Sequence, residues 1–208
     1  MQFGQTVVTL GREYGSGGHE IGRQLAQRMG VPFYDREILT RAARDSGICE
    51  GVLAEYDEKA TAGYLFSLAA QPGEVAEGLG VNMSMPLNHR VFLAQFEAIT
   101  RLAAEGPCVI VGRCGNYVLK EQRHVVNFFL YAPVEERIRR IMRVEGLPHD
   151  QAKDRVRRMD KQRQNYYNFF ADGNWGYRGN YHLMFNTQGM DTSDAAEVLL
   201  EYAKRFKG

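Results

Sequence analysis

The sequence predicts a doubly wound α/β fold with a mostly parallel sheet. Five short apolar runs alternate along the chain with helical patterns, which is typical of strands that are connected through helices. At least three of the runs lack a strict apolar–polar alternation, as expected of strands that are buried on both faces. The five expected strands are Thr6–Leu10, Val31–Tyr34, Cys108–Gly112, His124–Ala132 and Tyr181–Asn186.

The segments between these runs carry apolar residues three and four positions apart, which predicts helices. One helix ends at Gly30, and a second ends before Gly106. A third begins at Pro133, which suits a first turn, and acidic residues follow it at the positive end of the helix dipole. The last expected helix covers about residues 192–206.

The composition of the chain argues against nucleic-acid-binding, membrane and secreted proteins. A chain of 208 residues with a net charge of +1 is long enough for one core and carries no overall charge typical of nucleic-acid or membrane-surface binding. It has no apolar run of 18 residues and no signal-peptide pattern at its start. Three cysteines without a CxxC pattern favour reduced thiols, so we expect a cytoplasmic protein without a nucleic-acid or membrane partner.

The stretch from Arg137 to Arg163 is rich in arginine although the whole chain is nearly neutral. Such local basic density indicates a small anionic ligand, and a solvated helix face is the alternative. An aromatic stretch, NYYNFFADGNWGYRGNY, follows it before the last strand. These aromatic residues either cap the core or form a cover over a ligand.

A glycine-rich turn, GREYGSGGHE over residues 11–20, joins the first strand to the first helix. Backbone N–H groups at such a helix N-terminus point at one spot and attract phosphate, and glycines let the ligand approach closely. A tight turn without a ligand is the alternative. The expected phosphate-binding residues are Gly15, Ser16, Gly17, Gly18, His19 and Glu20.

This turn departs from both common glycine-rich patterns. The dinucleotide pattern would need a third glycine at position 20, which is Glu20. Aligned with the helix of an ordinary P-loop, Gly18 takes the lysine position and His19 the position of the magnesium-binding hydroxyl, while Arg12 replaces the first glycine. His19 could equally be a helix-surface residue.

Charged residues follow two of the expected strands. Asp35 comes directly after the second strand, with Arg41 six residues later, and Arg113 directly follows the third strand. Ligands of open α/β sheets bind at the carboxyl ends of the strands, so these residues are expected to contact a substrate or a metal. The planar guanidinium of Arg113 suits a phosphate group.

Three motifs together resemble the cytidylate kinase-like family, a branch of the P-loop nucleoside monophosphate kinases. They are GREYGSGGHEIGRQLAQRMGVPFYDREIL, VIVGRCGNYVL and RRMDKQRQNYYNFF. The resemblance implies a three-layer fold with a five-stranded parallel sheet and one P-loop kinase domain. Its core would be residues 1–35, 91–136 and 179–208, with a helical substrate-binding insert at about 36–90 and an Arg-rich helical lid at about 137–178.

The resemblance also implies roles for single residues. The expected catalytic residues are Arg12, Asp35, Arg158 and Arg163. The expected substrate-binding residues are Asp35, Arg41, Arg113 and Asp160, with Arg137 and Arg140 at the opening edge of the lid. This chain departs from the family pattern at the P-loop lysine, which is absent, and at Cys114, Gln162 and Asn165. Arg12 is the first candidate to supply the charge of the missing lysine.

The resemblance implies phosphoryl transfer from ATP, bound with Mg²⁺, to a small acceptor. A nucleoside monophosphate such as CMP is the first candidate, because an anionic acceptor needs no general base. The alternative is a nucleotide-binding regulatory or sensor protein with little or no kinase activity, since the loop lacks its lysine and carries His19. A scaffold domain with an empty loop is a third possibility. The sequence does not give the oligomeric state or any protein ligand to a metal.

Overall fold

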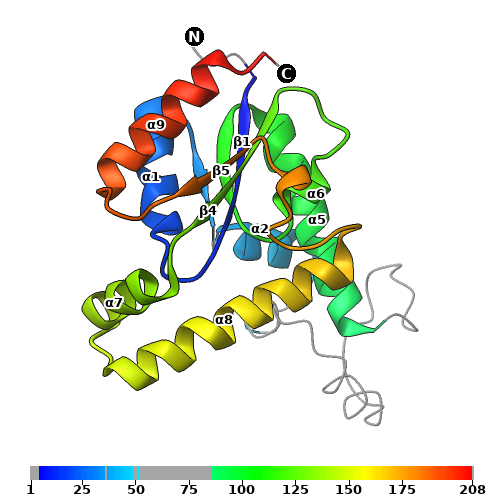
Figure 1. The fold of residues 1–208 in the computed structure, drawn as a ribbon. Helices are drawn as coiled ribbons and strands as arrows, with labels where there is room; N and C mark the ends of the chain where they lie inside the picture. Colours follow the sequence, from blue (N-terminus) through cyan, green and yellow to red (C-terminus); the bar gives the residue numbers. More distant parts are fainter. Residues whose placement is uncertain (1–4, 36, 49–50, 52–85, 208) are drawn as a thin grey trace.

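The computed structural model describes residues 5–35, 37–48, 51 and 86–207 (Figure 1). These residues form a five-stranded sheet in the order β2-β3-β1-β4-β5, and every described pairing is parallel. The predicted fold class is therefore confirmed. The strands are β1 Val7–Arg12, β2 Phe33–Tyr34, β3 Cys108–Val111, β4 Val125–Tyr131 and β5 Leu183–Asn186.

Helices connect the strands as the sequence predicts. Left-handed glycines close two of them, Gly30 after α1 and Gly146 after α7, which is a common way to end a helix. The described helices are α1 Gly18–Met29, α2 Glu37–Ser46, α5 Leu87–Glu105, α6 Gly115–Val118, α7 Val134–Glu145, α8 His149–Phe170 and α9 Thr192–Arg205, with a 3-10 turn, η1, at Arg178–Asn180. None of these helices is both long and apolar enough to cross a membrane.

The sheet lies between two helical layers (Figure 1). Helices α1 and α9 pack on one face, where Val8 and Leu10 of β1 are buried, and α2, α5 and α6 pack on the other, where Val7 is buried. Because both faces are covered, consecutive residues of β1 are apolar. This explains why the run shows no alternation in the sequence.

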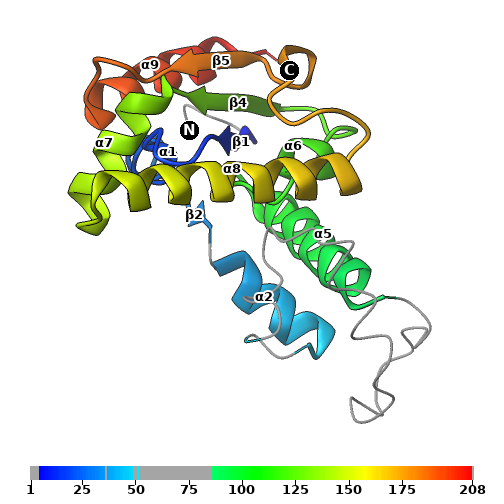
Figure 2. The ribbon, with the colours of Figure 1, turned by 60° about the horizontal axis from the view of Figure 1, so that its bottom comes forward.

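The carboxyl ends of β1, β3 and β4 meet at one edge of the sheet. Helix α8 runs across this edge from α7 towards α5 (Figure 2). Its far end packs on α5, where the rings of Phe170 and Phe92 are stacked at 4.3 Å and the Tyr166 hydroxyl donates a hydrogen bond of 2.6 Å to Gln95. The aromatic residues at this end of α8 therefore attach it to the core, and the edge beneath it is covered.

The expected insert, about residues 36–90, lies mostly outside the described residues. Within it the structure describes α2 and the first residues of α5, which begins at Leu87. The proposed division of the chain into core, insert and lid stays a prediction.

Candidate functional site

The glycine turn wraps between β1 and α1. Gly15 and Gly17 have φ angles of 82° and 85°, a left-handed conformation that glycine adopts without strain. Gly17 caps α1, and among the described residues no side chain accepts a hydrogen bond at this cap. The first N–H groups of α1 are thus free of a side-chain cap, as a phosphate site requires.

Ser16 takes a structural position in this turn. It is fully buried, its hydroxyl donates to the carbonyl oxygen of Glu13 at 2.8 Å, and its own carbonyl oxygen accepts a hydrogen bond from Thr187 at 2.9 Å. Thr187 directly follows β5. The backbone N–H of Ser16 also donates to the carbonyl oxygen of Glu13, at 3.3 Å, so all of its polar groups make contacts within the structure.

Arg137, expected at the lid, and Asp160, expected to bind substrate, both contact the glycine turn. Arg137, which is buried, donates to the carbonyl oxygen of Tyr14 at 3.1 Å and forms ion pairs with Glu13 and Asp160. Asp160 on α8 accepts a hydrogen bond of 2.7 Å from the backbone N–H of Tyr14. The contacts of Arg137 and Asp160 thus fix the shape of the turn and hold α7 and α8 against it.

A cavity of about 530 Å³ opens in front of the turn. This volume lies within the usual range of small-molecule sites, which is roughly 300–1,000 Å³. Residues of the glycine turn, the start of α1, the end of β2, and helices α7, α8 and α9 line it, among them Arg12, His19, Asp35, Arg140, Arg143 and Arg163. We call it the outer cavity.

Arg140 stands over the glycine turn. A Cβ atom added to Gly17 would lie 2.7 Å from Nη1 of Arg140. Among the described residues Arg140 has neither a hydrogen bond nor an ion pair, and burial, together with the neighbouring Arg143, lowers its pKa. An arginine without a bonded partner thus lies at the last glycine of the turn, beside the position where a P-loop carries its lysine.

Three basic side chains surround the carboxylate of Asp35. Arg113, only 4% exposed, donates a hydrogen bond to Oδ1, and Nη2 of Arg12 lies 3.9 Å from the same oxygen. Nδ1 of His19 is 2.7 Å from Oδ2. Burial raises the pKa of Asp35, but Arg12 and Arg113 outweigh it and bring the pKa down to about 2. Asp35 is therefore ionised at neutral pH and poorly suited to act as a general base.

This pKa predicts an acid-sensitive contribution to stability. The pKa of Asp35 in the folded protein, about 2, lies below the 3.8 of an unperturbed aspartate, so its contribution is complete above pH 4 and is lost as the pH falls through 2. The shift corresponds to about 2 kcal/mol at most. Urea unfolding at pH 5 and pH 2.5 should show a larger loss for the wild type than for Asp35→Asn. Equal losses would contradict the prediction.

The turn after β3 positions Arg113. Gly112, Arg113 and Cys114 have φ angles of 78°, 50° and 56°, and such a conformation costs a non-glycine residue on the order of 1–3 kcal/mol. This sharp turn brings the guanidinium of Arg113 back to the carbonyl oxygen of Val111 at 3.1 Å as well as to Asp35. Asp35 and Arg113 thus lie together at the carboxyl ends of β2 and β3.

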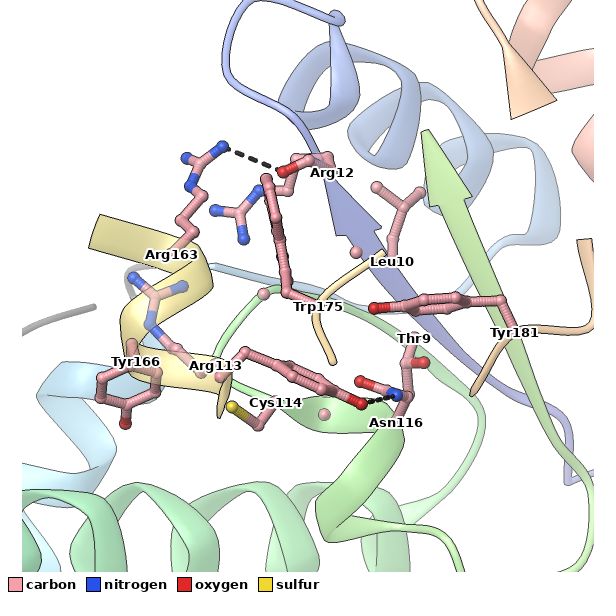
Figure 3. A pocket seen from close by; sticks show the side chains of 14 residues that line it. Thr9, Leu10, Arg12, Arg113, Cys114, Asn116, Arg163, Tyr166, Trp175 and Tyr181 are labelled. Atoms are coloured by element: carbon pink, nitrogen blue, oxygen red, sulfur yellow. Dashed lines mark hydrogen bonds between the residues drawn. The ribbon is translucent and has the colours of Figure 1, made fainter. Parts of the chain in front are cut away.

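A second, inner cavity of about 30 Å³ lies at the carboxyl ends of β1 and β3 (Figure 3). It has room for only a few water molecules. Arg163 donates a hydrogen bond of 3.2 Å to the carbonyl oxygen of Arg12, and both arginines line the inner and the outer cavity. The other lining residues include Arg113, Cys114, Asn116, Tyr166, Trp175 and Tyr181.

Three expected site residues lie apart from these cavities or make other contacts. Arg41 on α2 is bonded to Glu105 of α5 rather than to the Asp35 cluster. Arg158 is exposed on α8, and among the described residues it has no bonded partner. Glu20 lines the outer cavity, but its carboxylate accepts hydrogen bonds from Arg23 and Gln24 at 2.8 Å.

The outer cavity also contains residues that the sequence analysis missed. Arg143 follows Arg140 by three positions on α7, so helical spacing alone would have placed both on one face. Asp191 and Thr192 line the cavity beyond the carboxyl end of β5. The rule that ligands bind at strand ends, applied to the last strand, would have identified them.

Solved structures with the same fold include several kinases. A protein from Eubacterium ventriosum ATCC 27560, described as uncharacterized, matches with a TM-score of 0.72 and 23% identity, covering 97% of this chain and 100% of that chain. A shikimate kinase from Acinetobacter baumannii gives a TM-score of 0.51 at 18% identity, covering 96% and 94%. A gluconokinase from Sinorhizobium meliloti 1021 gives 0.52 at 13% identity, covering 97% and 93%. At these identities the likeness concerns the fold.

No curated protein matches the sequence at a significant level. The family comparison is more specific than the structural one. Residues 7–189 match the cytidylate kinase-like family, and this range includes the glycine turn, Asp35, Arg113 and both helices of the α7–α8 pair. The chain therefore belongs to the cytidylate kinase-like family.

Proposed function

We propose that the protein transfers the terminal phosphoryl group of ATP to a small acceptor, with a nucleoside monophosphate such as CMP as the first candidate. The family and the kinase-like P-loop fold support a phosphotransferase. The observation that carries the proposal is the outer cavity, where an uncapped helix N-terminus and several arginines face one space. Phosphoryl transfer depends mainly on positioning and on neutralisation of charge, which these groups supply.

The proposed roles follow the positions of the side chains. The amides of residues 15–20 bind the phosphates of ATP, and Arg140 supplies the positive charge that the turn lacks. Arg12, the other candidate, contacts Gly18 and lines the same cavity, but its guanidinium lies beside Asp35. Arg163 borders both cavities and would contact the phosphoryl group in transfer, while Arg113 would bind the acceptor phosphate.

The chain offers Mg²⁺ few suitable ligands. Magnesium prefers oxygen ligands, and here His19 stands at the position of the loop hydroxyl. Both oxygens of Asp35 already accept hydrogen bonds, and no cluster of three or more metal-ligating side chains occurs within the described residues. The donor set fits Mg²⁺ only as part of its complex with ATP, so we assign no step to the ion.

An anionic acceptor agrees with the base-poor site. A phosphate acceptor is already ionised and needs no group to remove a proton. Asp35 could not serve as that group, because its basic neighbours lower its pKa and make it a weak base. The test is an acceptor screen with Mg-ATP, a panel of nucleoside monophosphates and a set of hydroxyl acceptors. ADP formation that depends on a monophosphate is the expected result. ADP formation with hydroxyl acceptors alone would refute the proposed acceptor class.

The regulatory alternative is favoured by one observation. The inner cavity of about 30 Å³ is far smaller than the sites that hold drug-sized ligands. A protein that binds a nucleotide in the outer cavity and admits no acceptor would sense nucleotides without turnover. Calorimetry that shows ATP binding, combined with no ADP formation on any acceptor, would select this alternative. The absence of both ATP and ADP binding would refute both functions.

Trp175 provides an optical test of acceptor binding. It is the only tryptophan of the chain, it lines the inner cavity, and its ring packs edge-on against Phe129 at 5.4 Å. An acceptor that binds at the carboxyl ends of β1 and β3 must enlarge this cavity, so the emission spectrum of Trp175 is expected to shift when the acceptor is added to the ADP-bound protein. A spectrum that stays unchanged at saturating acceptor would place the acceptor elsewhere.

A further inference from the structure

His19 occupies a defined place in the outer cavity. It is the second residue of α1, and in the P-loop register it stands where a serine or threonine hydroxyl normally binds the metal ion of the nucleotide. Its side chain is 61% exposed and lines the cavity together with the glycine turn. A ligand on the turn would therefore meet the imidazole ring of His19.

Two contacts orient this ring. Nδ1 lies 2.7 Å from Oδ2 of Asp35, and the ring packs edge-to-face on Phe33 with centroids 5.3 Å apart. Asp35 is itself held through its other oxygen by Arg113. Because an ionised carboxylate only accepts hydrogen bonds, Nδ1 carries the proton and the lone pair of a neutral ring is on Nε2. Among the described residues Nε2 has no hydrogen-bond partner.

A carboxylate that fixes a histidine while its other nitrogen faces outward is the usual arrangement around a histidine metal ligand. Imidazole nitrogen binds first-row transition ions well and Mg²⁺ poorly, whereas phosphate oxygens bind both classes. Mn²⁺ accepts both kinds of ligand. The arrangement therefore suits a divalent ion that is shared between nucleotide phosphates and one ring nitrogen.

We propose that Nε2 of His19 is a direct ligand of the divalent ion in the nucleotide complex, and that the protein binds Mn²⁺ at this position in preference to Mg²⁺. Asp35 acts as a positioning residue that holds the ring. The inference rests on the proposed nucleotide site, but it applies equally to a phosphotransferase and to a nucleotide sensor.

The test uses the full chain with ADP and Mn²⁺, and it reads the metal directly. Pulsed electron paramagnetic resonance of the protein–ADP–Mn²⁺ complex should show coupling to an imidazole nitrogen, and labelling histidine with ¹⁵N should change the coupling. His19→Ser restores a hydroxyl at this position and should abolish the signal. His149→Ser should retain it, because His149 lies on α8 outside the outer cavity.

Affinities provide a second readout. We expect His19→Ser and Asp35→Asn to weaken Mn²⁺ binding to the ADP complex by about 10-fold or more, as loss of a ligand or of its supporting carboxylate usually does. His19→Ser should bind Mg²⁺ at least as well as the wild type. ADP affinity without metal should be the same in His19→Ser and in the wild type.

The outcomes separate this inference from the proposed function. If ADP binds but its Mn²⁺ shows no nitrogen coupling, the metal role of His19 is refuted and the nucleotide site stands. If His19→Ser weakens ADP binding in the absence of metal, His19 contacts phosphate and the metal role is equally refuted. If ADP does not bind with or without metal, both the nucleotide site and the inference fail.

Discussion

Replacement of Gly17 by valine is expected to weaken ATP binding by about 100-fold, or ~3 kcal/mol. Valine in the left-handed conformation of Gly17 strains the turn, and its Cβ would lie 2.7 Å from Nη1 and 3.0 Å from Cζ of Arg140. The guanidinium can move, but it then leaves the turn where its charge is needed. Isothermal titration with ATP measures the loss.

Gly30→Val is the matched control. Gly30 ends α1 with a φ angle of 67°, and nothing lies within 4 Å of an added Cβ. This variant therefore has a comparable backbone strain without any contact at the turn, and its ATP affinity should equal that of the wild type. If Gly17→Val also retains ATP affinity, the assignment of residues 15–20 as the phosphate site is wrong.

Arg113→Ala is expected to lower the free energy of unfolding by about 3 kcal/mol, because breaking a buried ion pair leaves the partner charge poorly compensated. Asp35 would keep His19, whose side chain is 61% exposed, and Arg12 at 3.9 Å. Where the variant folds, its KM for the acceptor should rise more than its KM for ATP. Urea unfolding and steady-state kinetics measure the two effects.

Arg139→Ala serves as the control for this loss of a charged pair. Arg139 pairs with Glu136 on the surface of α7, where its side chain is 66% exposed. Such surface pairs contribute about 0.5 kcal/mol or less. If both variants lose a similar free energy of unfolding, the Arg113–Asp35 pair adds no special stability. An unchanged KM for the acceptor in Arg113→Ala would rule out the acceptor role of Arg113.

The strands of the sheet could be predicted from the sequence because a strand that is buried on both faces is apolar at consecutive positions. Val7, Val8 and Leu10 are each 3% exposed or less, and an apolar run is the pattern that such burial requires. The strand-end rule likewise placed Asp35 and Arg113 each at the carboxyl end of a strand, and in the structure they are bonded to each other. Both predictions depend on local pattern and chain direction, which a single sequence contains.

The partners of the arginines were much harder to predict. Arg137 and Arg140 are three residues apart on α7, yet the first is bonded to the glycine turn from the side and the second stands over it. The stem of Arg12 lies against Gly18, whereas its guanidinium lies beside Asp35. The contacts of these arginines depend on how α7 and α8 pack against the turn. The sequence around a charged side chain does not specify which residue it will contact.

Tyr14 connects the order of the turn to the position of the α7–α8 pair. Its N–H group is bound to Asp160 on α8, and its carbonyl oxygen is bound to Arg137 on α7. Since one residue contacts both helices, docking of the helices and ordering of the turn are energetically coupled. By linkage, any ligand that orders the turn favours the docked helices by the same free energy, and damage to either helix contact lowers affinity at the turn.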